Sequence, residues 1–204
     1  MKTCGLILLA AGNSTRLGKP KQLLPWQNST LLQHAIQTAL AAIQQPVVVV
    51  LGASAPLLEP LLNKGAIHIV DNKEWGKGMA TSIVSGLTAL LAIQPSVDAV
   101  IFMVCDQPYV TKELLSAIIV TYRQTGKAIV ASAYGDIMGT PALFDKQLFP
   151  QLLQLQGDAG AKKIMTQNSG QLTTVPFPKG NIDIDTIEDY ERVRKSVESE
   201  SPKE

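Results

Sequence analysis

Residue types suited to binding phosphate are concentrated near the start of the chain. The ten positions 12–21 contain two glycines, two hydroxyl residues, one arginine and two lysines. A glycine-bearing turn directly after a strand exposes backbone N–H groups that can hold an anion. Arg16 offers a planar fork and Lys21 a point charge, and both would stabilise the charge that grows as pyrophosphate leaves. The segment therefore predicts a nucleotide triphosphate site.

Two well-known phosphate-binding motifs do not match this segment. A Walker A loop has four residues between its glycines and a hydroxyl residue after the lysine, whereas five residues separate Gly12 from Gly18 and the hydroxyl residue is missing. A dinucleotide-binding fingerprint needs Gly-x-Gly, whereas Asn13 and Ser14 follow Gly12. The loop is thus expected to bind phosphate without being a Walker A loop or a dinucleotide-binding loop.

Carboxylates at two places could supply a metal site. Asp106 ends an apolar run, where a carboxylate needs solvent or a cation, and the alternative is a cap for the following helix. Asp183 and Asp185 project from one face of an extended stretch. The alternative is that Asp185 belongs, with Glu188 and Asp189, to the acidic start of the last helix. Mg²⁺ usually takes only one or two protein carboxylates. We expect Asp106 with Asp183 or Asp185 to hold Mg²⁺.

Composition limits the class of protein. The 204 residues include 18 basic and 17 acidic side chains, and no stretch concentrates positive charge as nucleic acid or an acidic membrane surface would require. No apolar run approaches the roughly 20 residues of a membrane helix. Cys4 and Cys105 lie in apolar runs, which is typical of reduced, buried thiols. We expect a cytoplasmic protein with neither a nucleic-acid nor a membrane partner.

Apolar runs and helical periodicities alternate for most of the chain. Strands are expected at 5–11, 47–51, 66–70, 97–105, 128–133 and 172–175, with an extended segment at 141–144. Helices are expected after Ser29 as N-cap, over 56–62, 80–92 and 111–123, on both sides of Gly157-Asp158, and over 188–197. The chain is expected to form one domain over 1–197, followed by a disordered tail over 198–204.

The continuous apolar runs indicate strands covered on both faces, as in a parallel sheet with crossover helices. The fold class expected is a single-domain α/β/α sandwich of three layers, doubly wound around a mostly parallel sheet. Ligands bind in such sheets outside the carboxyl ends of the strands. The segments 12–21, 71–82 and 106–108 each follow an expected strand, so we expect them to form one site.

Five blocks of residues share a pattern with a known family. They read Leu9-Ala10-Ala11-Gly12-x-Ser14-x-Arg16-Leu17-Gly18-x-Pro20-Lys21-x-Leu23-Leu24, Asn72-x-x-Trp75 with Gly78-Met79-x-x-Ser82, Cys105-Asp106-Gln107-Pro108, Gly139-x-Pro141-x-Leu143-Phe144, and Leu155-x-Gly157-Asp158-x-Gly160-Ala161-Lys162 with Asp183-x-Asp185-Thr186. With these blocks the chain resembles the MobA-like NTP transferase family, which has the fold of the nucleotide-diphospho-sugar transferases. The resemblance points to the branch that contains molybdenum cofactor cytidylyltransferase.

The resemblance implies a role for particular residues. The implied nucleotide site comprises Leu9, Ala10, Ala11, Gly12, Ser14, Arg16, Lys21, Gly78, Met79 and Ser82. Arg16 and Lys21 would act on the phosphates during transfer. Asp106 and Asp185 would hold Mg²⁺, with Asp183 as the alternative.

The implied reaction is nucleotidyl transfer, in which a substrate phosphate attacks the α-phosphate of a nucleotide and pyrophosphate leaves. Related guanylyltransferases carry Gly-Gly where this chain has Ala11-Gly12, and the methyl group favours CTP over GTP. Molybdopterin is the expected acceptor, and a molybdenum hydroxylase apoenzyme the expected recipient of the product. Many relatives have a His where Thr140 stands, which leaves other phosphorylated acceptors open. Guanylyl transfer and a non-catalytic cofactor chaperone are the remaining alternatives.

Overall fold

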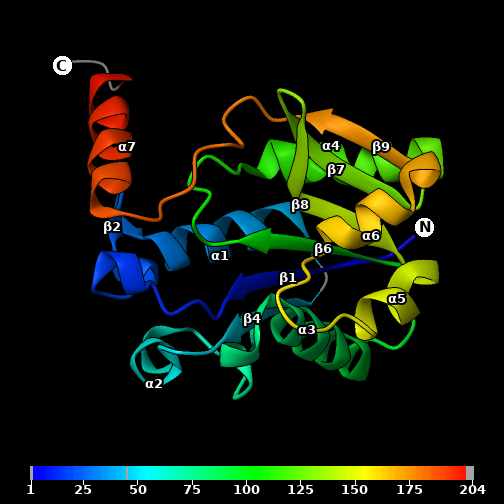
Figure 1. Cartoon of the computed structure of the whole chain (residues 1–204), viewed down its shortest axis with the longest axis horizontal. Helices are drawn as coiled ribbons and strands as arrows, with labels where there is room; N and C mark the ends of the chain where they lie inside the picture. Colours follow the sequence, from blue (N-terminus) through cyan, green and yellow to red (C-terminus); the bar gives the residue numbers. More distant parts are fainter. Residues whose placement is uncertain (1, 45, 201–204) are drawn as a thin grey trace.

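A seven-stranded sheet forms the centre of the computed structural model, which describes residues 2–44 and 46–200 (Figure 1). The strand order is β5-β4-β1-β6-β8-β7-β9. The strands are β1 (Cys4–Ala10), β4 (Val47–Leu51), β5 (His68–Asp71), β6 (Ala99–Val104), β7 (Ile129–Tyr134), β8 (Ile137–Asp145) and β9 (Leu172–Pro176). All five residues of β4 are buried, as its unbroken apolar sequence predicts.

The sheet is mostly parallel, as expected. Strands β5, β4, β1 and β6 pair in parallel, and so do β7 and β9. Strand β8 runs antiparallel to both β6 and β7. The extended segment expected at 141–144 is the second half of β8, which begins at Ile137 after a tight turn at Gly135. This hairpin brings β8 between two strands that precede it in the chain.

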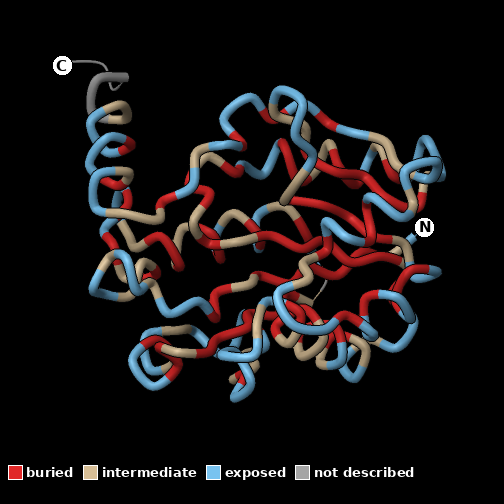
Figure 2. Tube along the Cα trace, viewed as in Figure 1, coloured by how far each residue is buried: buried red, intermediate tan, exposed pale blue. Residues whose placement is uncertain are grey.

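Helices cover both faces of the sheet, which confirms the three layers. Helices α1 (Leu31–Ala42) and α4 (Lys112–Thr125) pack on one face. Helices α3 (Met79–Ile93), α5 (Phe149–Leu153) and α6 (Lys162–Gln167) pack on the other. The buried residues follow the sheet and the inner sides of these helices, while the connecting loops are largely exposed (Figure 2). A short helix, α2 (Ala55–Leu58), follows β4.

A smaller core lies beside the sheet, where the last helix meets a short hairpin. Helix α7 (Ile187–Glu200) packs against β2 (Pro25–Trp26) and β3 (Ser29–Thr30), with Trp26, Leu31, Ile184 and Tyr190 buried between them. The Tyr190 hydroxyl donates to the Pro25 carbonyl at 2.8 Å. Figure 1 shows α7 standing at the side toward which β1 and β6 point. The segment before α7 therefore crosses the carboxyl ends of these strands.

Several expected boundaries differ from the structure, and the ends of two helices show how. Thr30, not Ser29, caps α1, because the side chains of Thr30 and Gln33 form a reciprocal capping box. Helix α7 extends to Glu200, into the stretch expected as a disordered tail. The rest of that stretch, 201–204, lies outside the described residues. Among the described helices, none combines the length and apolar character needed to cross a membrane.

Candidate active site

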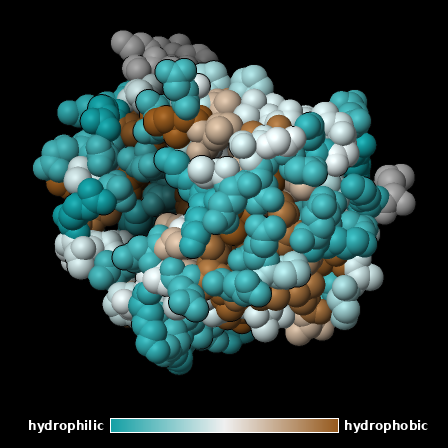
Figure 3. All heavy atoms as spheres, turned by 45° about the vertical axis from the view of Figure 1, so that its right-hand side comes forward, coloured by the Kyte–Doolittle hydropathy of each residue, from teal (hydrophilic) through white to brown (hydrophobic). Residues whose placement is uncertain are grey.

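A cleft of about 730 Å³ opens where β1 and β6 end. Figure 3 shows a hollow in the surface with hydrophilic residues around its mouth. The predicted site residues that line the cleft are Leu9, Ala10, Ala11, Gly12, Arg16, Lys21, Gly78, Met79, Ser82, Asp106 and Asp185. The expected convergence of three separate segments on one site is therefore present.

The loop after β1 presents backbone N–H groups without internal partners. Within the described residues, the N–H groups of Gly12, Asn13 and Ser14 donate to no protein acceptor. Ser14 adopts a left-handed conformation with φ of 53°, which bends the chain into a concave turn. Consecutive free N–H groups in such a turn suit an anion. The Ser14 hydroxyl itself accepts from the Lys21 N–H at 3.0 Å, and Ser14 does not line the cleft.

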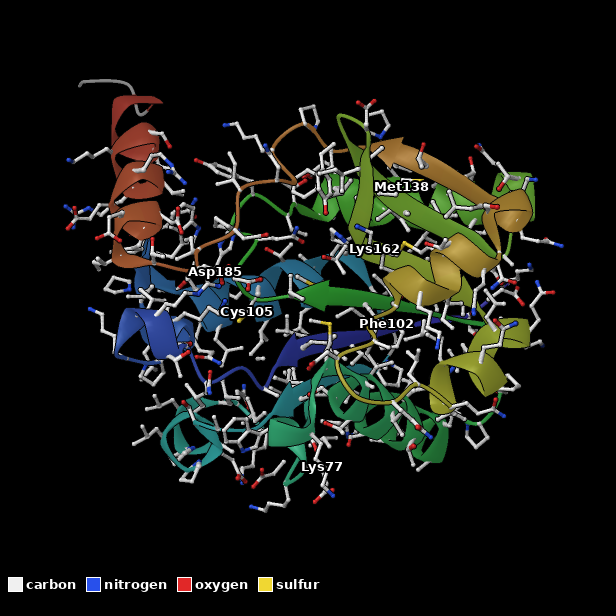
Figure 4. The ribbon with its side chains drawn as sticks, viewed as in Figure 1. Lys77, Phe102, Cys105, Met138, Lys162 and Asp185 are labelled. Atoms are coloured by element: carbon white, nitrogen blue, oxygen red, sulfur yellow. The ribbon has the colours of Figure 1, made fainter. Side chains whose placement is uncertain are left out.

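Lys21 joins the loop to two carboxylates. Its Nζ lies 2.6 Å from Asp106 Oδ2 and 2.8 Å from Asp185 Oδ1. Burial would lower the pKa of Lys21, but the charge of Asp106 and hydrogen bonds to both carboxylates raise the pKa above its ordinary value. Figure 4 shows Asp185 near Cys105, which follows the end of β6 and directly precedes Asp106. The ammonium group is held in its charged form at the end of the cleft.

Arg16 lies at the exposed edge of this charge cluster. Its Nη2 is 2.9 Å from Asp185 Oδ2, and two-thirds (67%) of its side chain is exposed. The hydrogen bond from Lys21 is the largest cause that lowers the pKa of Asp185, and the charges of Lys21 and Arg16 add to it. Arg16, Lys21, Asp106 and Asp185 thus form one network of alternating charge.

Asp183 differs from the other two candidate metal ligands in its place relative to the cleft. Asp183 does not line the cleft, and burial followed by the charges of Asp106 and Asp185 raises its pKa to about 6. Across the described residues, no three His, Cys, Asp or Glu side chains gather as a ready-made metal centre. Asp106 and Asp185 are the pair that the fold brings together, both on Lys21.

One carboxylate oxygen in this pair fits a cation. Asp106 Oδ1 is buried and has no hydrogen-bond partner within the described residues. A buried carboxylate oxygen without a donor is unfavourable unless a cation or water meets it. Asp106 and Asp185 offer the oxygen ligands that Mg²⁺ prefers, and Mg²⁺ leaves its other positions to water and substrate phosphates.

Several residues of the cleft have roles that sequence reasoning did not assign. The Asn72 side-chain amide donates to Thr81 Oγ1 at 2.9 Å and to Ser82 Oγ at 3.0 Å, so it fixes the first turn of α3. Trp75, Asp158 and Gln22 line the cleft, whereas Asn72 supports it from behind Ser82 without lining it. All but Gln22 lie in motif blocks that the resemblance singled out, so position in a block was the available signal. For Gln22 the only signal is a polar residue next to Lys21 in a leucine-rich segment.

Residues 6–172 match the model of the MobA-like NTP transferase domain. The chain belongs to the MobA-like NTP transferase family. It is similar to nicotine blue oxidoreductase of Paenarthrobacter nicotinovorans, with 30% identity over 92% of this chain and 94% of the relative. It is also similar to the molybdenum cofactor cytidylyltransferase of Escherichia coli, with 23% identity over 93% of this chain and 95% of that enzyme.

Solved structures agree with the family assignment. Rv0371c of Mycobacterium tuberculosis superposes with a TM-score of 0.81 at 28% identity, covering 95% of this chain and 98% of that protein. A complex of the same mycobacterial protein with manganese has a TM-score of 0.77 at 26% identity over 96% of this chain and 100% of that protein. The family is one of nucleotidyltransferases, and the cleft described above lies at the edge of the sheet where such folds bind ligands.

Proposed function

We propose that this protein is a magnesium-dependent cytidylyltransferase that converts CTP and molybdopterin into molybdopterin cytosine dinucleotide and pyrophosphate. In this reaction an oxygen of the molybdopterin phosphate forms a bond to the α-phosphorus of CTP. The bond from that phosphorus to the bridging oxygen breaks, and pyrophosphate leaves with the electron pair. The observation that carries the proposal is Lys21, whose N–H donates to the Ser14 hydroxyl of the loop and whose side chain contacts Asp106 and Asp185.

Each part of the cleft has a task in this proposal. The N–H groups of the loop and Arg16 hold the phosphates, and Lys21 stabilises the charge that develops on the leaving pyrophosphate. Asp106 and Asp185 would hold Mg²⁺, which supplies Lewis-acid stabilisation of phosphate charge when it is bound. The protein contributes position and charge, with no covalent intermediate. A molybdenum hydroxylase apoenzyme is the proposed recipient of the product.

Ala11 supports CTP as the nucleotide. Its side chain lines the cleft and is only 7% exposed. The backbone behind it is closely packed, since a Cβ built on Gly52 would lie 2.8 Å from the Ala11 Cβ. The methyl group is therefore a fixed part of the wall, and it takes space that a purine base would need.

The charge network also favours an enzyme over a non-catalytic cofactor chaperone. A chaperone has no need of a lysine held between two carboxylates at a phosphate-binding loop. Among relatives, one from Bacillus mycoides (24% identical) is named a probable molybdenum cofactor guanylyltransferase, so GTP is the main competitor for CTP. The relative from Paenarthrobacter is named an oxidoreductase, although the loop here lacks the second glycine of a dinucleotide fingerprint.

A panel of nucleotides and acceptors tests the proposal. The purified protein is incubated with Mg²⁺, molybdopterin and each of CTP, GTP, ATP and UTP, and pyrophosphate release is followed. CTP is expected to give the fastest release and a product with the mass of the cytosine dinucleotide. A sugar phosphate in place of molybdopterin tests other acceptors, and NADPH oxidation tests redox chemistry. Faster release with GTP, or release only with another acceptor, would contradict the assignment.

A further inference from the structure

Gln22 lies beneath the phosphate-binding loop and is almost completely buried, with 1% of its surface exposed. It is the middle residue of a 3₁₀ turn, Lys21–Leu23. Its Nε2 donates to the carbonyl of Ala10 at 2.8 Å and to the carbonyl of Gly12 at 3.1 Å. These two carbonyls flank Ala11, so one side-chain amide holds the backbone on both sides of the cleft wall.

The two acceptors determine how the amide is turned. The opposite orientation would place Gln22 Oε1 against two carbonyl oxygens, which would repel it. In the orientation present, Oε1 is buried without a partner in the described part of the chain. A buried acceptor without a donor is unfavourable, and a fully satisfied network would avoid it. The two bonds donated by Gln22 Nε2 therefore offset the cost of burying Gln22 Oε1 without a hydrogen bond in the described part of the chain.

These bonds control which polar groups of the loop face the ligand. A backbone carbonyl carries partial negative charge and repels phosphate, whereas an N–H group attracts it. Gln22 takes up the Ala10 and Gly12 carbonyls, while the N–H groups of Gly12, Asn13 and Ser14 stay free. The neighbouring Lys21 N–H bonds to the Ser14 hydroxyl. The 3₁₀ turn thus bonds to the loop at the Ala10 carbonyl, the Gly12 carbonyl and the Ser14 hydroxyl.

We infer that Gln22 is a positioning residue that pre-organises the loop for the phosphate chain of the nucleotide. It acts through the backbone on both sides of Ala11, by its bonds to the Ala10 and Gly12 carbonyls. The inference rests on the proposed function only in that the loop is taken to bind nucleotide phosphates. It holds for any nucleotide base and any acceptor.

Pyrophosphate and CTP binding in the presence of Mg²⁺, measured by calorimetry, tests this role. Gln22→Met keeps the length of the side chain and removes both donors. We expect it to raise the Kd of both ligands by the same factor, about tenfold, because a less organised loop costs more to order on binding. In turnover assays the KM for CTP should rise by a similar factor and kcat should change less than about threefold.

Gln33→Met is the matched control. Gln33 accepts from the Thr30 N–H in the capping box of α1, so the same substitution removes a helix cap outside the cleft. It should lower the thermal midpoint and leave both Kd values unchanged. Amide hydrogen exchange over residues 10–14 should accelerate in Gln22→Met and not in Gln33→Met. If Gln22→Met does not fold, Gln22→Asn, which is too short to reach both carbonyls, replaces it.

The outcomes separate this inference from the proposed function. Unchanged pyrophosphate and CTP binding in a folded Gln22→Met protein overturns the inference, as does a loss confined to CTP. A wild-type protein that binds neither ligand also overturns it. A wild-type protein that binds pyrophosphate and loses that binding in Gln22→Met supports the inference, even if no transfer to molybdopterin is found and the proposed function fails.

Discussion

Lys21 is the residue at which the loop and the carboxylates of the cleft meet. Its side chain is 12% exposed and contacts Asp106 and Asp185 at the same time. Removing one member of such a partly buried group leaves charge without compensation, which costs more than the pair contributes. The lysine therefore holds the two carboxylates in place.

Ala11 carries the prediction of base preference. In Ala11→Gly the cleft wall loses a methyl group, and the discrimination between CTP and GTP should fall by about 10-fold or more, corresponding to about 1–3 kcal/mol. The measurement is kcat/KM for each nucleotide under identical conditions. Ala99→Gly is the control, because the buried Ala99 belongs to the core on the side of α1 and α4 and does not line the cleft. An unchanged CTP/GTP ratio in Ala11→Gly would show that the base is selected elsewhere.

At the scale of elements, the start of α3 and the turn at Gly157 approach each other unusually closely. A Cβ on Gly78 would lie 2.4 Å from the Gly157 carbonyl oxygen and 2.6 Å from Asp158 Oδ1. Gly78 also has φ of +106°, which favours glycine. The Ala80 N–H donates to Gly157 O at 3.1 Å. The contact places Asp158 in the wall of the cleft.

Gly78→Ala should therefore displace the Gly157 turn and lower both stability and activity. We expect a loss of about 1–3 kcal/mol in the free energy of unfolding, from backbone strain and the clash together. The KM for the nucleotide should rise as well. Gly76→Ala is the control, because a Cβ there meets nothing within 4 Å although Gly76 also lines the cleft. Equal behaviour of the two variants would mean that the close approach has no role in the site.

The sequence predicted the elements better than their arrangement. The apolar run at 47–51 is bounded by Pro46 and Gly52, and its strand has those limits. For the segment around Pro141 the sequence predicted an extended conformation but not the direction of the strand, because a pattern of apolar residues does not encode that direction. That β8 turns back from Tyr134 and inserts beside β6 depends on pairing between residues far apart in the chain.

The site was predictable where residues follow strands directly. Asp106 was identified because a carboxylate that ends an apolar run needs solvent or a cation. Lys21 was expected to bind phosphate, and its contact with Asp106 was not predicted. The choice between Asp183 and Asp185 could not be made from alternation alone, since it depends on how the segment crosses the sheet. Gln22 was missed because its two bonds are to backbone carbonyls, which leave no pattern in residue types.

At the scale of the whole molecule, Asp98 joins the beginning and middle of the chain. It accepts from the Thr3 N–H at 3.0 Å and from Lys146 Nζ at 2.8 Å. The hydrogen bond from Lys146, followed by that from Thr3, lowers the pKa of Asp98 from 3.8 to about 2. The ionised carboxylate thus ties strands β1 and β8 together at the edge opposite the cleft.

The sign of the resulting pH dependence follows from the lowered pKa. The stabilisation by Asp98 is present above pH 3.8 and is lost as the pH falls toward about 2. Asp98→Asn should lower the thermal midpoint near neutral pH and reduce the fall in midpoint between pH 4 and pH 2. Thermal unfolding followed by circular dichroism checks this, with Asp136→Asn in the exposed β7–β8 turn as control. An equal fall in thermal midpoint between pH 4 and pH 2 for Asp98→Asn and wild type would contradict this role of Asp98.

Nucleotidyl transfer itself is tested most directly by following the α-phosphate of CTP. Wild-type protein, Lys21→Met and the control Lys19→Met are each incubated with Mg²⁺, molybdopterin and CTP labelled at the α-phosphate. The label is expected in a molybdopterin dinucleotide with wild type and Lys19→Met, and at a rate lower by roughly 10²-fold with Lys21→Met, because a charge that stabilises the transition state is removed. Label that stays in CTP with the wild-type protein, or equal transfer by wild type and Lys21→Met, would contradict this account.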